Sequence, residues 1–203
     1  MTVATLGRRE QNKREKRGRI IAAARALFTH KGFEATTSAE IAIAAGVAAG
    51  TVFTYARTKD ELLIMVFHEE FVELSDRGYR AAAQQEGLLD QAMAYFQTIV
   101  SHHERDLPLA RALMRQLGYV EDESQRAHVE EIMTITFRLL GRMVETAKAK
   151  GEIDASVASL PLVRNLFAIF YYHLGSFLSG YFDRARLDRL LRTDMAVLLK
   201  GLR

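Results

Sequence analysis

The chain has 203 residues, 49% of them hydrophobic, with two prolines, no tryptophan and no cysteine. The absence of cysteine excludes disulfides, thiolate metal sites and a cysteine nucleophile. The hydrophobic content is ample for a buried core, but no run approaches the roughly 18 apolar residues of a membrane span, and the N-terminus is too polar for a secretory signal. We therefore expect a cytoplasmic protein without a membrane partner. Abundant alanine and leucine with so few prolines predict an all-α chain.

The formal net charge of +3 hides an asymmetry along the sequence. Residues 1–60 hold 11 Lys and Arg against 5 Asp and Glu, whereas the remaining residues hold 17 against 20. A basic front end on a mildly acidic body is typical of a protein that touches nucleic acid with one end only.

Residues 1–17 are rich in lysine and arginine and show no apolar periodicity before Ile20. One interpretation is a solvated, frayed terminus. The other is a flexible basic arm whose cations, Arg17 among them, lie along DNA phosphates or enter the minor groove. Both stay open at this stage.

Residues 20–59 carry the densest set of local signals. Ile20, Ala24 and Phe28 belong to the apolar stripe of an amphipathic helix that Gly32 ends. Thr37 followed by Glu40 is a capping-box pattern, so a second helix is expected just after Thr37 and up to Gly46. A short third helix over 49–55 follows the glycine turn. Helix, glycine turn and helix are the layout of a helix-turn-helix, whose second helix enters the DNA major groove.

In order, these motifs resemble the opening of the TetR family of transcriptional regulators over about 50 residues. The residues that carry the resemblance are Lys31-Gly32-Phe33, Thr36-Thr37, Ile41-Ala42, Ala45-Gly46-Val47, Gly50-Thr51, Phe53, Tyr55, Lys59 and Leu62-Leu63. The resemblance implies three parts: a basic arm (1–17), a helix-turn-helix domain (18–64) and a helical domain for effector binding and dimerisation (65–203).

The family resemblance also implies which residues meet DNA. We expect a base contact from Thr54 and phosphate contacts from Tyr55 and Lys59, because Val52 and Phe53 are needed for packing. Helix capping is an equally good interpretation of Thr37. The full set of expected DNA-binding residues is Arg17, Thr36, Thr37, Ser38, Ala49, Gly50, Thr51, Thr54, Tyr55, Arg57 and Lys59.

Three residues depart from the family pattern. Ala48 replaces the usual Ser or Thr that caps the recognition helix, at a cost of about 0.5–2 kcal/mol. Phe53 lacks the hydroxyl of the usual Tyr, and Ala56 lacks the bulk of the usual Phe. These changes predict a less conventional DNA footprint, in which Arg57 restores a phosphate contact.

Beyond the helix that starts at Lys59 and is expected to end near Gly78 or in residues 81–87, we expect helices at 88–104, 107–117, 124–149, 160–182 and 184–201. The last two are apolar over more than one face, which favours burial on two sides and a homodimer built from them. The expected interface residues are Phe167, Leu174, Phe177, Leu178, Leu187, Leu191, Met195 and Leu198.

The family body holds a small-molecule pocket, and the apolar residues here favour a largely apolar effector. Met and aromatic residues at helical spacing are equally typical of an ordinary core. The candidate lining is Met93, Phe96, His103, Met114, Arg115, Met133, Phe137, Phe170, Tyr171 and His173.

Other chemistry finds little support. The triplets His102-His103-Glu104 and His68-Glu69-Glu70 point their side chains in different directions on a helix, so a solvated surface explains them better than a metal or hydrolase site. HExxH, GxSxG, GxGxxG and P-loop patterns are absent. We expect no cofactor, no metal and no enzyme activity, and a repressor released from a palindromic operator by its effector. Two alternatives stay open: an architectural DNA-binding protein without an effector, whose body should lack a cavity, and a helical ligand carrier or enzyme.

Overall fold

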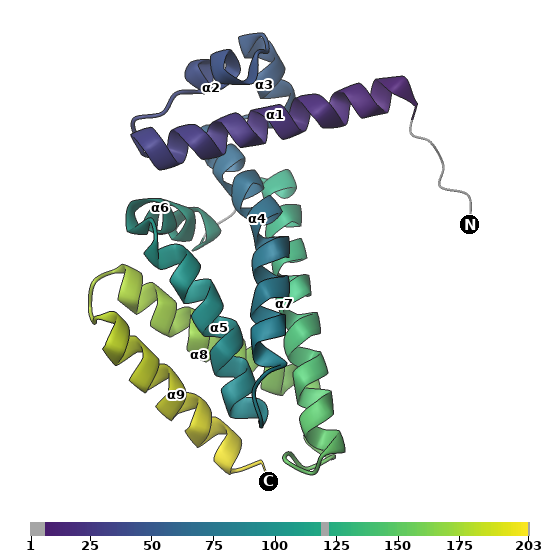
Figure 1. Cartoon of the computed structure of the whole chain (residues 1–203), viewed down its shortest axis with the longest axis vertical. Coiled ribbons are helices and arrows are strands. Elements are labelled where there is room, and N and C mark those ends of the chain that lie inside the picture. Colours follow the sequence, from purple (N-terminus) through teal and green to yellow (C-terminus); the bar gives the residue numbers. More distant parts are fainter. Residues whose placement is uncertain (1–6, 119–121, 203) are drawn as a thin grey trace.

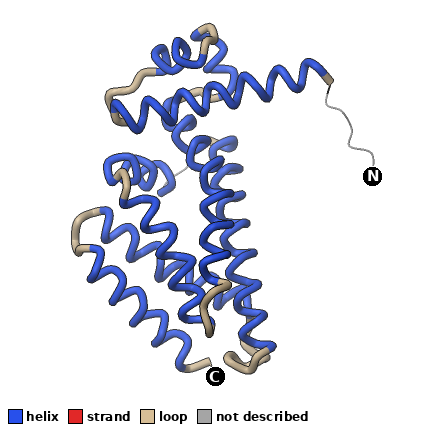
Figure 2. Tube along the Cα trace, in the orientation of Figure 1, coloured by secondary structure: helices blue, strands red, loops and turns tan. Residues whose placement is uncertain are grey.

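The computed structural model describes residues 7–118 and 122–202, and every regular element in these ranges is an α-helix (Figure 2). The all-α prediction is confirmed. The helices are α1 (Arg8–Lys31), α2 (Ser38–Ala45), α3 (Ala49–Tyr55), α4 (Lys59–Ala82), α5 (Leu88–Glu104), α6 (Leu107–Gly118), α7 (Glu123–Ala149), α8 (Ser159–Leu178) and α9 (Arg184–Lys200).

Helices α1 to α3 form a small head at one end of the molecule (Figure 1). Ile20, Phe28, Ile41 and Val52 are at most 1% exposed and make its core. Phe33, in the turn after α1, packs edge-to-face on Phe28 with ring centroids 5.1 Å apart. Fully burying each large apolar side chain stabilises the fold by about 1.5–3 kcal/mol, and this burial holds the three helices together.

Helix α1 begins at Arg8, so the expected flexible arm is wrong for residues 8–17, which form its first turns. Gly7 precedes α1 as its N-cap, and the expected arm residues 1–6 lie outside the described residues. These turns have no apolar stripe because they project beyond α2 and α3 (Figure 1). Arg, Lys, Glu and Gln nevertheless have good helix propensity, and Glu10 favours the first turn through the helix dipole.

Helix α4 connects the head to the body, which comprises α4 to α9. Thr58 caps α4, since its hydroxyl accepts a hydrogen bond of 3.0 Å from the Glu61 backbone N–H. The first half of α4 packs on α1, and the helix then runs down between α5 and α7 (Figure 1). The expected division between domains at residue 64 falls inside this continuous helix, and it stays a prediction.

Helix α4 ends at Ala82, inside the stretch 81–87 where the sequence predicted its end. Gly78, the other predicted end, lies inside the helix. A Cβ atom there would lie 2.9 Å from Tyr95 Cδ2 and 3.2 Å from the Tyr95 carbonyl oxygen. The glycine therefore permits the close approach of α4 and α5. Tyr95 is fully buried there, with its hydroxyl 3.4 Å from Ser75 Oγ.

Helix α8 ends at Leu178, four residues before the predicted end. The chain reverses at Gly180, whose φ is +81°. The Tyr181 N–H donates to the Ser176 carbonyl at 3.0 Å, and the Gly180 N–H donates to Phe177 at 2.9 Å. These bonds satisfy the last carbonyls of α8 and turn the chain into α9, which packs along α8.

Candidate functional site

The helix-turn-helix forms as the local signals predict. The Thr37 hydroxyl accepts from the Glu40 N–H at 3.3 Å, and the Glu40 carboxylate accepts from the Thr37 N–H at 2.9 Å. The Lys31 ammonium and the Thr37 groups lower the pKa of Glu40 to about 2. Gly46 adopts the left-handed conformation, and the axes of α2 and α3 differ by 102°.

Helix α3 buries Val52 in the head and leaves Ala49, Gly50, Phe53 and Thr54 exposed. Because Ala49 and Gly50 are small, the helix backbone can approach a partner surface closely at its first turn. The Thr54 hydroxyl donates a hydrogen bond of 3.2 Å to the Gly50 carbonyl, and Thr51 is partly buried. The expectation that Phe53 packs in the core is wrong, because its side chain is 54% exposed.

Residues 36–38 divide into a buried position and two accessible ones. Thr36 is 2% exposed, and its hydroxyl donates to the Gly32 carbonyl at 2.8 Å, so it braces the turn and cannot reach DNA here. Thr37 is exposed and Ser38 partly exposed at the start of α2. The capping and DNA-contact interpretations of Thr37 therefore remain compatible.

The expected phosphate-binding residues already have partners within the protein. Lys59 Nζ donates to the carbonyls of Phe33 at 2.8 Å and Glu34 at 3.1 Å. The Tyr55 hydroxyl donates to the Lys13 carbonyl at 3.1 Å, which ties α3 to α1. Arg17 pairs with Glu69 on α4.

Arg57 has the most accessible of the expected cationic side chains, at 82% exposure, and lies 3.3 Å from Asp122 Oδ2. Ala48 provides no side-chain cap, which leaves α3 without this support at its first turn. Ala56 is 2% exposed, so this position faces the core, as the family pattern implies.

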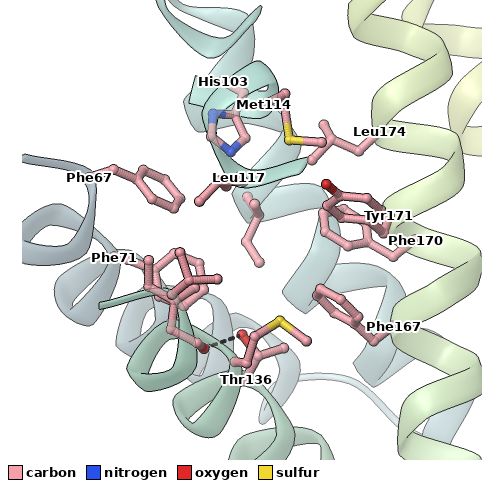
Figure 3. A pocket seen from close by; sticks show the side chains of 14 residues that line it. Phe67, Phe71, His103, Met114, Leu117, Thr136, Phe167, Phe170, Tyr171 and Leu174 are labelled. Carbon is pink, nitrogen blue, oxygen red and sulfur yellow. Dashed lines mark hydrogen bonds between the residues drawn. The ribbon is translucent and has the colours of Figure 1, made fainter. Parts of the chain in front are cut away.

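A cavity of about 310 Å³ lies in the body between α4, α5, α6, α7 and α8 (Figure 3). Its volume falls at the lower end of the range of about 300–1,000 Å³ for small-molecule pockets. The lining residues are Phe67, Phe71, Ile99, His103, Met114, Leu117, Val129, Ile132, Met133, Thr136, Phe167, Phe170, Tyr171 and Leu174. All of these side chains are apolar except His103, Thr136 and Tyr171.

Half of the candidate pocket residues reach this cavity: His103, Met114, Met133, Phe170 and Tyr171. The other five do not line it. Phe96 stacks on the Phe170 ring with centroids 4.2 Å apart, and Phe137 lies against Phe167. Met93 is an ordinary core residue. Arg115 points to the head, and His173 bonds Asp194 on α9 at 2.8 Å.

The sequence interpretation missed the two residues that α4 contributes, Phe67 and Phe71. Both lie on the apolar face of α4, and helical periodicity gives no sign that a cavity lies beyond them. Phe167 and Leu174 also line the cavity, although we expected them in a dimer interface.

The interface prediction is contradicted for most of its residues by their burial within one chain. Leu187, Leu191 and Met195 are 0% exposed, and Leu174, Phe177 and Leu178 are at most 9% exposed. Only Phe167 and Leu198 are partly accessible. The apolar stripe identified in the sequence is the one that packs α8 and α9 onto their own subunit.

Other kinds of site are not found in the described part of the chain. No group of three or more His, Cys, Asp or Glu side chains there could hold a metal ion. No single described helix is long and apolar enough to cross a membrane. Helices α2 and α3 pass that test only when taken together, across their 102° bend.

A helix-turn-helix head joined by one continuous helix to a helical body is the architecture of a DNA-binding transcriptional regulator. Residues 20–66 match the family model described as "Bacterial regulatory proteins, tetR family". The head of this chain therefore matches the TetR-family DNA-binding domain, as the opening motifs indicated.

Individual relatives agree with this assignment. The HTH-type transcriptional repressor KstR of Rhodococcus jostii is 29% identical over 173 residues, which cover 83% of this chain and 80% of KstR. The crystal structure of Thermus thermophilus FadR in complex with lauroyl-CoA has a TM-score of 0.75 at 23% identity, covering 91% of this chain and 94% of that one. FadR of Bacillus subtilis in complex with stearoyl-CoA has a TM-score of 0.70 at 20% identity, covering 91% and 98%. At such identities the structures support the fold.

Proposed function

We propose that the protein is a homodimeric repressor that leaves a palindromic operator when a small, largely apolar effector fills the body cavity. The observation that carries this proposal is that α4 belongs to both halves of the molecule. Its Phe67 and Phe71 line the cavity, while its first half packs on α1 of the head. Acting on chromosomal DNA, the protein would work in the cytoplasm of a bacterium.

The contacts around α4 give the effector a route to the head. Glu70, one turn from Phe67 and adjacent to Phe71, pairs with Arg25 of α1 and lies 3.1 Å from His102 of α5. An effector that pushes on the two phenylalanines therefore acts on a helix that is fixed to α1. The mechanism is a population shift between DNA-competent and DNA-incompetent head positions, driven by the difference in effector affinity for the two.

The lining supports an apolar effector. Phe67, Phe71, Phe167 and Phe170 present aromatic faces to a common space, which favours aliphatic or aromatic groups over charged ones (Figure 3). Two FadR neighbours are complexes with lauroyl-CoA and stearoyl-CoA. We extend this to the present chain as a ligand class, molecules with a substantial hydrocarbon portion.

The dimer interface follows from the large apolar residues that stay exposed. Apart from Tyr171, which lines the cavity, those on α8, α9 and the turn between them are Leu160, Tyr172, Tyr181 and Val197, with exposures from 51% to 77%. We place the interface on this outer face of α8 and α9, in place of the residues expected from the sequence. Two heads would then present their α3 helices to two half-sites of the operator.

The first test is fluorescence-anisotropy binding of the full chain to the intergenic DNA upstream of its own gene, against a shuffled duplex, at two salt concentrations. We expect tight binding with a clear excess for the natural duplex. Equal and steeply salt-dependent binding would mean phosphate contact without sequence readout. No binding at low salt would overturn the DNA-binding function.

The dimer is tested with two exposed valines. Val197→Glu, on α9, is expected to give a monomer in analytical ultracentrifugation and to weaken operator binding. Val72→Glu, on α4 at 44% exposure, is the matched control and should leave both unchanged. Dimers of normal affinity in Val197→Glu would move the interface elsewhere. The architectural alternative predicted a body without a cavity, and the 310 Å³ space contradicts it.

A further inference from the structure

His103 is a buried polar side chain without a polar partner in the described part of the chain. It is 6% exposed and lines the cavity from α5. Its ring stacks on Phe67 with centroids 5.4 Å apart, and its other aromatic neighbour is His102 at 5.5 Å. Both contacts fix the ring without using its nitrogen atoms. Buried polar groups usually have a hydrogen-bond partner. His103 has none among the described residues, and the cavity has room for a ligand that would supply one.

The other polar groups of the cavity do not compete for the same role. The Thr136 hydroxyl already donates to the Ile132 carbonyl at 3.0 Å, the bond that Figure 3 draws. Tyr171 is 37% exposed, so its hydroxyl can be satisfied by water. Figure 3 shows that hydroxyl and the His103 ring on the Met114 side of the cavity, and Thr136 on the opposite side.

The described residues that line the cavity include no lysine, arginine, aspartate or glutamate. An ionised group placed there would lose its hydration without gaining an opposite charge, which is strongly unfavourable. Arg115, next to Met114 in sequence, points to Glu34 in the head and cannot serve.

We propose that the effector carries one uncharged oxygen, a hydroxyl or a carbonyl, that hydrogen-bonds to His103, and that an ionised carboxylate is excluded from the cavity. This inference rests on the proposed function of the cavity as the effector site and names the chemistry of the ligand. A neutral imidazole has one donor and one acceptor nitrogen, so it can serve either kind of oxygen. Free acids would be rejected in favour of alcohols, ketones, esters or thioesters of similar shape.

The electrostatics of the site support this assignment. Burial, and next the neighbouring His102, lower the pKa of His103 to about 3, with Glu70 opposing the shift. The ring is therefore uncharged at neutral pH and cannot attract a carboxylate as a cation would.

The test uses rigid probes of matched size that fit the cavity: 2-naphthol, 2-methylnaphthalene and 2-naphthoate. Binding to the full chain is measured by isothermal titration calorimetry at pH 7.5. In the wild type we expect 2-naphthol to bind about tenfold more tightly than 2-methylnaphthalene, as one well-formed hydrogen bond provides. We expect 2-naphthoate to bind most weakly of the three.

Two variants assign the effect to His103. His103→Phe keeps a planar ring against Phe67 and should remove the advantage of 2-naphthol, while 2-methylnaphthalene binds as before. His103→Gln keeps a neutral donor and acceptor and should retain part of the advantage, which also guards against a folding defect in the first variant. Tyr171→Phe, which removes the accessible hydroxyl of the cavity, is the matched control and should leave the advantage intact.

Each outcome decides the question. An advantage that survives His103→Phe, or that disappears in Tyr171→Phe instead, overturns the role of His103 but leaves the cavity as an effector site. Tightest binding of 2-naphthoate overturns the exclusion of carboxylates. If none of the three probes binds, the cavity is not a ligand site, and the proposed function fails together with this inference.

Discussion

Arg115 on α6 donates a hydrogen bond of 2.9 Å to Glu34 in the turn between α1 and α2. The neighbouring α6 residues Met114 and Leu117 line the cavity. One short helix therefore touches both the effector site and the head, at a place distinct from α4. The pair is largely exposed, with side chains 59% and 77% accessible, so its own contribution to stability is small.

We predict that Arg115→Glu weakens the response to effector. It places two carboxylates opposite each other and releases α6 from the head, so about two- to fivefold more effector should be needed for half-maximal operator release. Effector titrations of the protein–DNA complex by anisotropy measure this. The double exchange Glu34→Arg with Arg115→Glu should restore the response, and a double variant no better than the single one would contradict the role of the pair.

Phe53 is half-exposed on the recognition helix, and we predict that it contributes to operator affinity. Apolar side chains in the major groove contact thymine methyl groups. Phe53→Ala should lower specific affinity by about tenfold, corresponding to one lost base contact of about 1–3 kcal/mol, and should change the melting temperature little. Val72→Ala removes an exposed apolar side chain of the body and is the control for both measurements. Unchanged affinity in Phe53→Ala would exclude it from the DNA interface.

Gly78→Ala is expected to destabilise the body. The new methyl group would meet the Tyr95 ring at 2.9 Å and its carbonyl at 3.2 Å, where the backbone cannot yield easily. Overpacking of this kind costs about 1–3 kcal/mol, more than the gain of about 1 kcal/mol in helix propensity. Urea denaturation measures the difference.

The control for that substitution is Gly141→Ala on α7, where a Cβ atom meets nothing within 4 Å. At that position the substitution changes only the helix propensity, so the variant should be more stable by up to about 1 kcal/mol. Destabilisation of both variants to the same degree would show that close packing of α4 on α5 is not the cause.

His103 predicts a pH dependence of stability. Its pKa is about 3 in the folded protein and returns to its ordinary value of 6.5 on unfolding. Because the folded pKa is the lower one, the contribution is fully present above pH 6.5 and is lost as the pH falls from 6.5 towards 3. Between pH 6.5 and pH 5 the loss approaches about 2 kcal/mol.

The measurement is the free energy of unfolding in urea at pH 7.5 and at pH 5, in the wild type and in His103→Phe. The decrease between the two pH values should be smaller in the variant by that amount, since it no longer takes up the proton on unfolding. His30→Gln, at an exposed position, controls for the removal of a histidine as such. Equal decreases in all three proteins would contradict a neutral buried His103.

The head could be predicted closely because its signals are local. The capping box of Thr37 and Glu40, the left-handed Gly46 and the limits of α3 at Ala49 and Tyr55 all depend on neighbours within a few residues. The same is true of the start of α4 at Thr58. Hydrogen bonds to the backbone at helix ends are made by residues close in the chain, so they can be predicted from the local sequence.

The faces of these helices were harder to predict, because burial depends on elements far away in the chain. Phe53 was expected to pack in the core but is exposed. Thr36 was expected to contact DNA but is buried, and its hydroxyl donates to the Gly32 carbonyl. Periodicity shows that a helix has an apolar side but not which partner covers it. Leu187 and Leu191 illustrate this, since their stripe packs inside the subunit.

By itself, then, the sequence determined an all-α regulator with a helix-turn-helix head, since capping, glycine turns and apolar periodicity act over short stretches of chain. Only the tertiary structure decided that Phe67 of α4 and His103 of α5 face one cavity, and that Gly78 is the point where these two helices meet. The physical reason is that a cavity is the space left when several helices pack together. No single helix carries a signal for it.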